Sequence, residues 1–303
     1  MNQPDSGHAP PSRALLRSFR SRRLWILLAA LLACHHLWVF HSTQDELQLL
    51  VMLMLIWGGA LLCIEDLLPS LDPRPTRGGL ILGAVLVVWS VLRAELILAR
   101  DFVIYLLPLI EGLGLALLCA PPRRLRPFAA SLLILSLFMP AVLVRKFYDH
   151  YPEAPLSHLT ALATGVGLQT VGIPADVQGR LVSLPYGAVE VSGPCSGRDL
   201  MVMVILVAVI FLLAFPLDRW RNRMFVLLAA VPLAMLSNVI RIALLALIVG
   251  FQVPHQQVLF DFFHEDMGSL VFSVIAVALL ARLYLLLIDR QLAAAAVPPD
   301  AGS

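Results

Sequence analysis

Eight long apolar runs constrain the fold of this sequence more than any other feature. Each is long enough to cross the roughly 30 Å hydrocarbon core of a bilayer as a helix. The composition agrees, since 59% of the residues are hydrophobic, 14% are charged and the mean hydropathy is +0.86. These values exclude a water-soluble core. The sequence predicts an all-α polytopic membrane protein with about eight transmembrane helices, at about 24–40, 47–64, 78–99, 102–120, 127–144, 200–217, 224–250 and 267–288.

The placement of Lys and Arg between the runs predicts the orientation of the chain. Of the 22 basic residues, 15 fall on one side of the predicted spans and five on the other, while Arg93 and Arg241 lie within spans. The side with more positive charge is expected to be cytoplasmic. Both termini are therefore predicted to be cytoplasmic, and the net charge of +2 does not indicate a nucleic acid partner.

The spans and loops together predict five segments. Residues about 145–199 form the one sizeable extramembrane stretch, a short extracytoplasmic α/β segment with a helix over Leu156–Gln169 and two strands within Arg180–Val191. The segments are a cytoplasmic basic tail (1–23), an N-terminal five-helix membrane region (24–144), the extracytoplasmic segment leading to a Cys motif (145–199), a C-terminal three-helix catalytic membrane region (200–288) and a cytoplasmic tail (289–303).

In this topology only one of the four cysteines, Cys195, lies on the outer side. It has no partner for a disulfide, and an unpaired thiol in an oxidising compartment is a liability unless it is used. We therefore interpret Cys195 as a reactive nucleophile; the alternative is a small apolar filler at a helix start. Cys34 gives a weaker alternative, a lipidation box after a basic region, but the apolar run continues beyond it.

The residues around Cys195 favour reactivity. Ser196 and Asp199 have the spacing of a helix capping box, which predicts that the sixth span begins at Ser196. The partial positive charge of a helix N-terminus, with Arg198 within one turn, favours a thiolate. Gly193 and Gly197 would let backbone N–H groups approach a substrate carbonyl. The alternative for Ser196 and Asp199 is a helix cap with no part in catalysis.

Arg241 lies within the long seventh span, in the leaflet nearer the outer face. A charge at that depth is costly, so it is expected to face a polar cavity or a carboxylate. Asn238, three residues earlier, shares its helix face and could orient it. A structural ion pair with Glu111 or Glu95 is the alternative.

His264 comes at the start of the last predicted span. An imidazole changes its protonation state near neutral pH, so His264 could accept the proton of a thiol and return it to a leaving amine. Gly268, four residues later, would leave room for a neighbouring helix or for substrate. His255 is the reserve candidate for the same role.

Together these motifs resemble the exosortase/archaeosortase family of membrane transpeptidases, over roughly Pro127–Ile288. The matching elements are the Cys-Ser-Gly before a span, the Asn238-to-Arg241 pair in the next, and His264 with Gly268 at the last. One departure concerns Arg198, since many family members place an Arg four residues after the Cys, whereas Arg198 follows at three.

The resemblance implies a catalytic trio of Cys195, Arg241 and His264 on the extracytoplasmic face of a bacterial inner membrane. It implies no cofactor. Its substrates would be exported proteins with a C-terminal sorting signal, made of a short motif, a hydrophobic helix and a basic end. Cys195 would form a thioester, His264 would act as acid and base, and Arg241 would stabilise the oxyanion or orient the substrate. The acceptor nucleophile stays unidentified, and membrane lipid surrounds the chain.

Two other classes of protein are alternatives. A transporter or lipid-carrier scaffold would use Arg241, Glu111, Arg93 and Glu95 to line a solute path, but paired broken helices are missing from the pattern. A metal-dependent intramembrane protease lacks its ligand motif, because the HEDMG segment is not HExxH.

Overall fold

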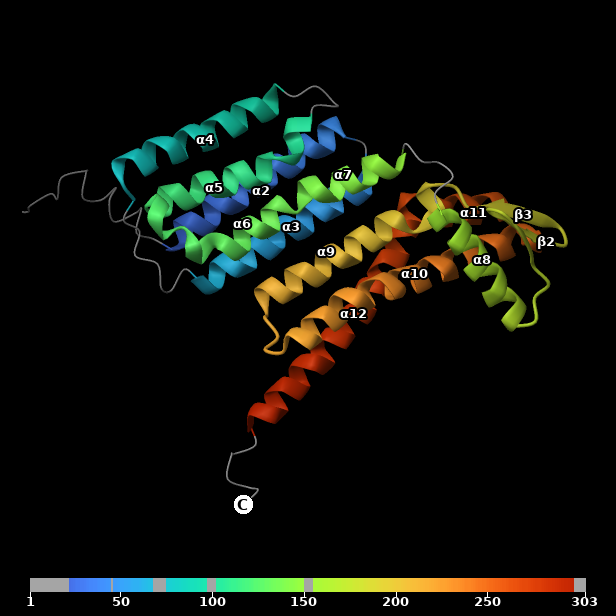
Figure 1. The fold of residues 1–303 in the computed structure, drawn as a ribbon. Helices are drawn as coiled ribbons and strands as arrows, with labels where there is room; N and C mark the ends of the chain where they lie inside the picture. Colours follow the sequence, from blue (N-terminus) through green and yellow to red (C-terminus); the bar gives the residue numbers. More distant parts are fainter. Residues whose placement is uncertain (1–21, 45, 68–74, 97–101, 150–154, 297–303) are drawn as a thin grey trace, which may run out of the picture. The chain divides into compact units, whose positions relative to one another are not determined.

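The computed structural model describes residues 22–44, 46–67, 75–96, 102–149 and 155–296, and within them the chain forms two compact units (Figure 1). Unit 1 comprises Met1–Glu46 and Leu53–Phe138, and unit 2 comprises Leu47–Met52 and Met139–Ser303. The predicted tail 1–23 lies almost wholly outside the described residues, as does the end of the tail 289–303. Each unit is described by itself.

Unit 1 is a bundle of apolar helices. Two of them make a close contact through glycines: a Cβ on Gly83 would lie 2.7 Å from the Gly114 carbonyl oxygen, and one on Gly114 would lie 2.8 Å from the Val87 side chain. Small residues of this kind let helices in a membrane approach closely. The helices are α2 (Arg22–Thr43), α3 (Leu47–Leu67, entering unit 1 at Leu53), α4 (Arg77–Glu95), α5 (Leu107–Cys119, after the 3₁₀ turn η2 at Phe102–Tyr105) and α6 (Ala129–Ser136).

Unit 2 combines long helices with a small sheet. In Figure 1 the helices α9, α10 and α12 lie side by side, and the strands and α8 gather near one end of α10. The elements are α7 (Phe138–Asp149), α8 (Pro155–Thr170), β1 (Asp176–Gln178), β2 (Leu181–Leu184), β3 (Gly187–Glu190), the 3₁₀ turn η5 (Pro194–Ser196), α9 (Arg198–Ala214), α10 (Trp220–Gly250), α11 (Gln256–His264) and α12 (Asp266–Ala296).

The sheet is antiparallel with strand order β1-β2-β3. Its tight turn brings Leu184 opposite Gly187. The helix α8 and the strands β2 and β3 confirm the predicted helix and the two predicted strands of this segment, and β1 is a third strand that was not predicted. The sheet packs against the end of α10, where a Cβ on Gly250 would lie 2.5 Å from the Leu184 Cβ. The buried core beneath it includes Val182, Val191 and Cys195.

The structure confirms an all-α membrane fold with about eight spans. Six helical segments are long and apolar enough to cross a membrane: Leu24–Thr43, Leu47–Glu65, Arg77–Glu95, Arg126–Phe147, Trp220–Gly250 and Met267–Ala293. The other two predicted spans correspond to shorter helices, α5 with 13 residues and α9 with 17.

One predicted span is interrupted between α6 and α7 at Leu137. Pro140 follows three residues later and has no N–H to donate to the carbonyl of Ser136, so the helical ladder loses one hydrogen bond near this point. The predicted fifth span is therefore two consecutive helices.

Candidate active site

Cys195 lies in the buried turn η5 between the sheet and α9, with only 4% of its surface exposed. Its N–H donates to the Ser192 carbonyl at 3.1 Å, and the Ser196 N–H donates to the Gly193 carbonyl at 3.1 Å. The carbonyl of Cys195 accepts a hydrogen bond from Asn238 Nδ2 at 3.0 Å. The backbone that carries the thiol is therefore held on both sides.

The predicted capping box at Ser196 is wrong. Helix α9 begins at Arg198, because Gly197 has a φ of +86° and separates the turn from the helix. The Ser196 hydroxyl donates to the Gly193 carbonyl at 2.6 Å and accepts a 3.4 Å contact from the Arg198 N–H, so it does not bond to Asp199 as a capping box requires.

Gly197 satisfies two requirements at once. Its left-handed φ is a conformation that residues with a side chain rarely adopt. A Cβ at this position would also lie 2.7 Å from Asn238 Nδ2. The close approach of the turn to α10, and with it the hydrogen bond to Cys195, depends on a glycine here.

Arg198 and Asp199 form a buried ion pair. Arg198 Nε donates to Asp199 Oδ1 at 2.9 Å, and Arg145 Nε lies 3.7 Å from Asp199 Oδ2. Both residues of the pair are under 10% exposed. The carboxylate offsets much of the positive charge that Arg198 was expected to direct at the thiol.

Arg241 is 4% exposed and binds the end of α11. Its Nε donates to the Phe263 carbonyl at 2.9 Å, and its Nη2 donates to the His264 carbonyl at 2.7 Å. These carbonyls belong to the last turn of α11, where a cation is favoured by the helix dipole and by unpaired carbonyl groups. The guanidinium thus fixes the backbone of His264.

His264 ends α11 rather than opening the last span, which is a correction, since α12 begins at Asp266. Its exposed ring stacks on Phe260, with 5.2 Å between ring centroids and 15° between planes. Gly268, in the first turn of α12, lies so close to α11 that a Cβ there would overlap the Phe262 carbonyl. The reserve candidate His255 precedes the first residue of α11 and therefore lies at the opposite end of that helix.

The structure links the predicted site residues into one chain of contacts. The side chain of Asn238 donates a hydrogen bond to the carbonyl of Cys195, and Arg241 donates one to the carbonyl of His264. Asn238 and Arg241 are three residues apart on α10. All of them belong to unit 2. The sequence placed these residues at one face, and the structure supplies the hydrogen bonds that hold their backbones.

Sequence reasoning missed Thr160 on α8. Its Oγ1 donates to the Ser196 carbonyl at 2.8 Å and lies 3.7 Å from Met235 Sδ on α10. Ser157, one turn earlier, donates a longer 3.4 Å contact to the Ser192 carbonyl. The signal that could have found them is the row of hydroxyl residues Ser157, Thr160 and Thr164 at helical spacing.

The acidic residues that were the alternative partners of Arg241 lie in unit 1 beside histidines. Glu111 Oε2 is 3.7 Å from His36 Nδ1, with both side chains fully buried, and Glu95 Oε1 is 3.0 Å from His35 Nε2. Arg241 donates hydrogen bonds to two carbonyl oxygens of α11.

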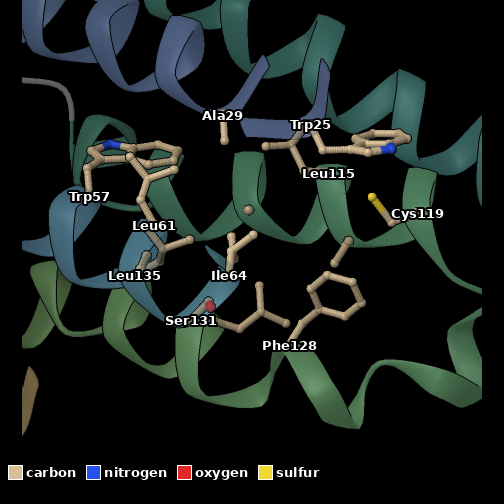
Figure 2. Close-up of a pocket in the computed structure, with 14 residues that line it drawn as sticks. Trp25, Ala29, Trp57, Leu61, Ile64, Leu115, Cys119, Phe128, Ser131 and Leu135 are labelled. Atoms are coloured by element: carbon tan, nitrogen blue, oxygen red, sulfur yellow. The ribbon is translucent and has the colours of Figure 1, made fainter. Parts of the chain in front are cut away.

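Unit 1 also contains a pocket with apolar walls (Figure 2). Trp25, Trp57, Leu115 and Phe128 are among the residues that line it, from α2, α3, α5 and the turn before α6. The charged residues of the transporter alternative do not line this pocket. It therefore does not provide the polar solute path which that alternative requires.

These features define a multi-pass α-helical membrane protein in which a cysteine, an arginine and a histidine are connected at one end of a long span. A comparison with family models matches residues 47–281 to the transmembrane exosortase family (Exosortase_EpsH). The match covers more than half of the chain, and the chain belongs to this family. It is thus a membrane transpeptidase of the exosortase type. Comparisons with curated proteins and with solved structures found no match.

Proposed function

We propose that this protein is a cysteine-dependent exosortase of the bacterial inner membrane. It would cleave the C-terminal sorting signal of exported proteins through a thioester on Cys195 and transfer the product to an acceptor. The observation that carries the proposal is the pair Asn238 and Arg241, which binds the backbones of Cys195 and His264 from one helix. The active site is expected on the extracytoplasmic face, with both termini cytoplasmic.

In the first step the Cys195 sulfur attacks the carbonyl carbon of the scissile peptide bond, and His264 accepts the thiol proton. The tetrahedral intermediate then breaks its C–N bond. His264 returns the proton to the leaving amine, and the exported protein stays on Cys195 as a thioester. An amine or hydroxyl of the acceptor attacks the thioester and regenerates the thiol, while water gives hydrolysis.

The contacts refine the role of Arg241. Its Nε and Nη2 hold the last carbonyls of α11 and therefore position His264. Contact with the oxyanion would use other donors of the guanidinium, which has five. The N–H groups of Cys195 and Ser196 are engaged inside the turn, so we assign oxyanion stabilisation to Arg241 in preference to them.

Substrate is proposed to approach the turn from the side of Gly193. A Cβ on Gly193 would have no atom within 4 Å, so this part of the turn borders open space. Cys195 itself is 4% exposed, and attack requires a local shift of the turn that exposes the sulfur.

The test is processing in cells of a tagged protein that carries a candidate C-terminal sorting signal. We expect the native chain to shorten the substrate and Cys195→Ala and Cys195→Ser to leave it at full length, at matched expression. Cys34→Ala is the control, because Cys34 is an exposed cysteine of α2 in unit 1. Continued processing by both Cys195 variants would refute the thiol mechanism and favour a different protease or the transporter alternative.

A further inference from the structure

Helix α8 (Pro155–Thr170) carries hydroxyl residues on its buried face and large apolar residues on its exposed face, which a helix on a water-facing surface does not favour. Its hydroxyl residues Ser157, Thr160 and Thr164 are fully buried. Its large apolar residues Leu159, Leu162 and Val166 are 53%, 49% and 52% exposed. The helix sequence also contains no Lys, Arg, Asp or Glu.

Contacts on the buried face fix the rotation of α8. Thr160 donates to the Ser196 carbonyl at 2.8 Å. Gly165 lies against β1 so closely that a Cβ there would overlap the side chain of Val177. The helix therefore cannot turn Leu159 and Leu162 inward without losing the hydrogen bond and the close packing.

The exposed apolar residues form a single stripe, which we call the α8 stripe: Leu159, Leu162 and Val166, at positions i, i+3 and i+7. Sixteen residues extend about 24 Å as a helix at about 1.5 Å per residue, which is short of the roughly 30 Å core of a bilayer. The helix is therefore too short to span the bilayer, and its exposed apolar face can lie along the membrane interface.

Lipid, rather than another protein surface, is favoured by continuity with a membrane span. Thr160 lies 3.7 Å from Met235 Sδ, so the middle of α8 packs beside this part of α10. The neighbouring residues of α10, Leu236 and Ile240, are each 52% exposed and belong to a span that lipid must cover. Lipid that covers these residues borders α8.

We propose that α8 is an interfacial membrane helix whose α8 stripe is immersed in the acyl chains of the leaflet that borders the Cys195 turn. The hydrogen bond from Thr160 to Ser196 then ties this turn to the bilayer surface. If the proposed function holds, the scissile peptide meets Cys195 directly beside its own hydrophobic helix. This last consequence rests on the proposed function, whereas the membrane contact of α8 does not.

The test measures the depth of single nitroxide labels by electron paramagnetic resonance. Full-length chains with the four native cysteines replaced by alanine carry one new cysteine at position 159, 162 or 166, in vesicles of phosphatidylcholine and phosphatidylglycerol. Oxygen concentrates in the bilayer, and a water-soluble nickel chelate stays outside it. Gln178 on β1, an exposed polar residue, is the control for a position expected in water. Leu285 on α12, which is 59% exposed in a candidate span, is the control for a position expected in lipid.

We expect the three labels of the α8 stripe to collide with oxygen as often as the Leu285 label and several-fold less with nickel than the Gln178 label. Labels that behave like Gln178 would show a water-facing helix and overturn the proposal. Labels shielded from both reagents would show a protein partner or a second copy on the stripe, and would overturn it equally.

A second measurement uses the unsubstituted protein, in case a labelled chain fails to fold. A phospholipid with a photoreactive diazirine in its acyl chain is expected to modify residues 155–170, and labelling confined to the spanning helices would contradict the proposal. Both measurements are independent of catalysis. Failure of Cys195→Ala to block processing would therefore refute the proposed function and leave the depth of α8 a separate result.

Discussion

Arg241 donates a 2.7 Å hydrogen bond from Nη2 to the backbone carbonyl of His264, which ends α11. This contact joins the long membrane helix α10 to the histidine that we propose as acid and base. Together with the hydrogen bond from Asn238 to Cys195 at 3.0 Å, it lets one helix face hold both reacting residues. This arrangement, together with Gly197 in the turn after Cys195, leads to four predictions.

Arg241→Lys is expected to reduce processing by roughly 10- to 100-fold. A lysine retains the charge but cannot donate from two nitrogens in a fixed fork to the carbonyls of Phe263 and His264. Losing one charge-assisted hydrogen bond costs about 1.5 to 3 kcal/mol, which gives that range. The measurement is the initial rate of substrate shortening. Arg180→Lys, in a partly exposed pair with Glu190, is the matched control and should process normally.

Asn238→Asp should abolish most processing while keeping the size of the side chain. The substitution removes the donor to the Cys195 carbonyl and places a carboxylate against that oxygen in a buried site. Asn222→Asp, at a half-buried position near the start of the same helix, should have little effect. Equal loss in both variants would mean that charge in α10, and not the bond to Cys195, is responsible.

His264→Ala is expected to lower processing by about 10²- to 10⁴-fold, the usual contribution of a positioned acid–base group. The exposed ring of His264 leaves no cavity when removed, so membrane insertion and thermal stability should stay close to native. His255→Asn tests the reserve candidate, because asparagine tolerates the left-handed φ of 59° at that position. If His255→Asn is the inactive variant and His264→Ala is not, the assignment of the acid and base is reversed.

Gly197→Ala should destabilise the protein by about 1 to 3 kcal/mol through its positive φ alone. Further loss comes from the overlap with Asn238, so processing should fall with stability. The melting temperature in detergent and the processing rate are measured together. Gly167→Ala is the control, since its Cβ would meet open space on α8. A stable, active Gly197→Ala chain would contradict the close approach of the turn to α10.

Several site features could be predicted because they depend on local spacing. Asn238 and Arg241 are three residues apart, and a helix places such residues on one face whatever surrounds it. The two strands around the turn at Pro185 were predictable because turn residues and alternating side chains specify a hairpin locally. The start of α9 was mispredicted, because Ser196 and Asp199 match a capping pattern that the φ of Gly197 prevents.

The sequence by itself determined that the chain is a polytopic membrane protein, since a bilayer requires long apolar helices and the eight runs are visible without any tertiary contact. It also determined which residue types can perform thiol chemistry. Only the tertiary structure decided that Arg241 binds the end of α11 and that Asp199 forms an ion pair with Arg198. It also decided that Thr160 donates a hydrogen bond to the turn that contains Cys195. These contacts join residues distant in the chain or depend on the exact backbone path, and their energies depend on packing that no local pattern encodes.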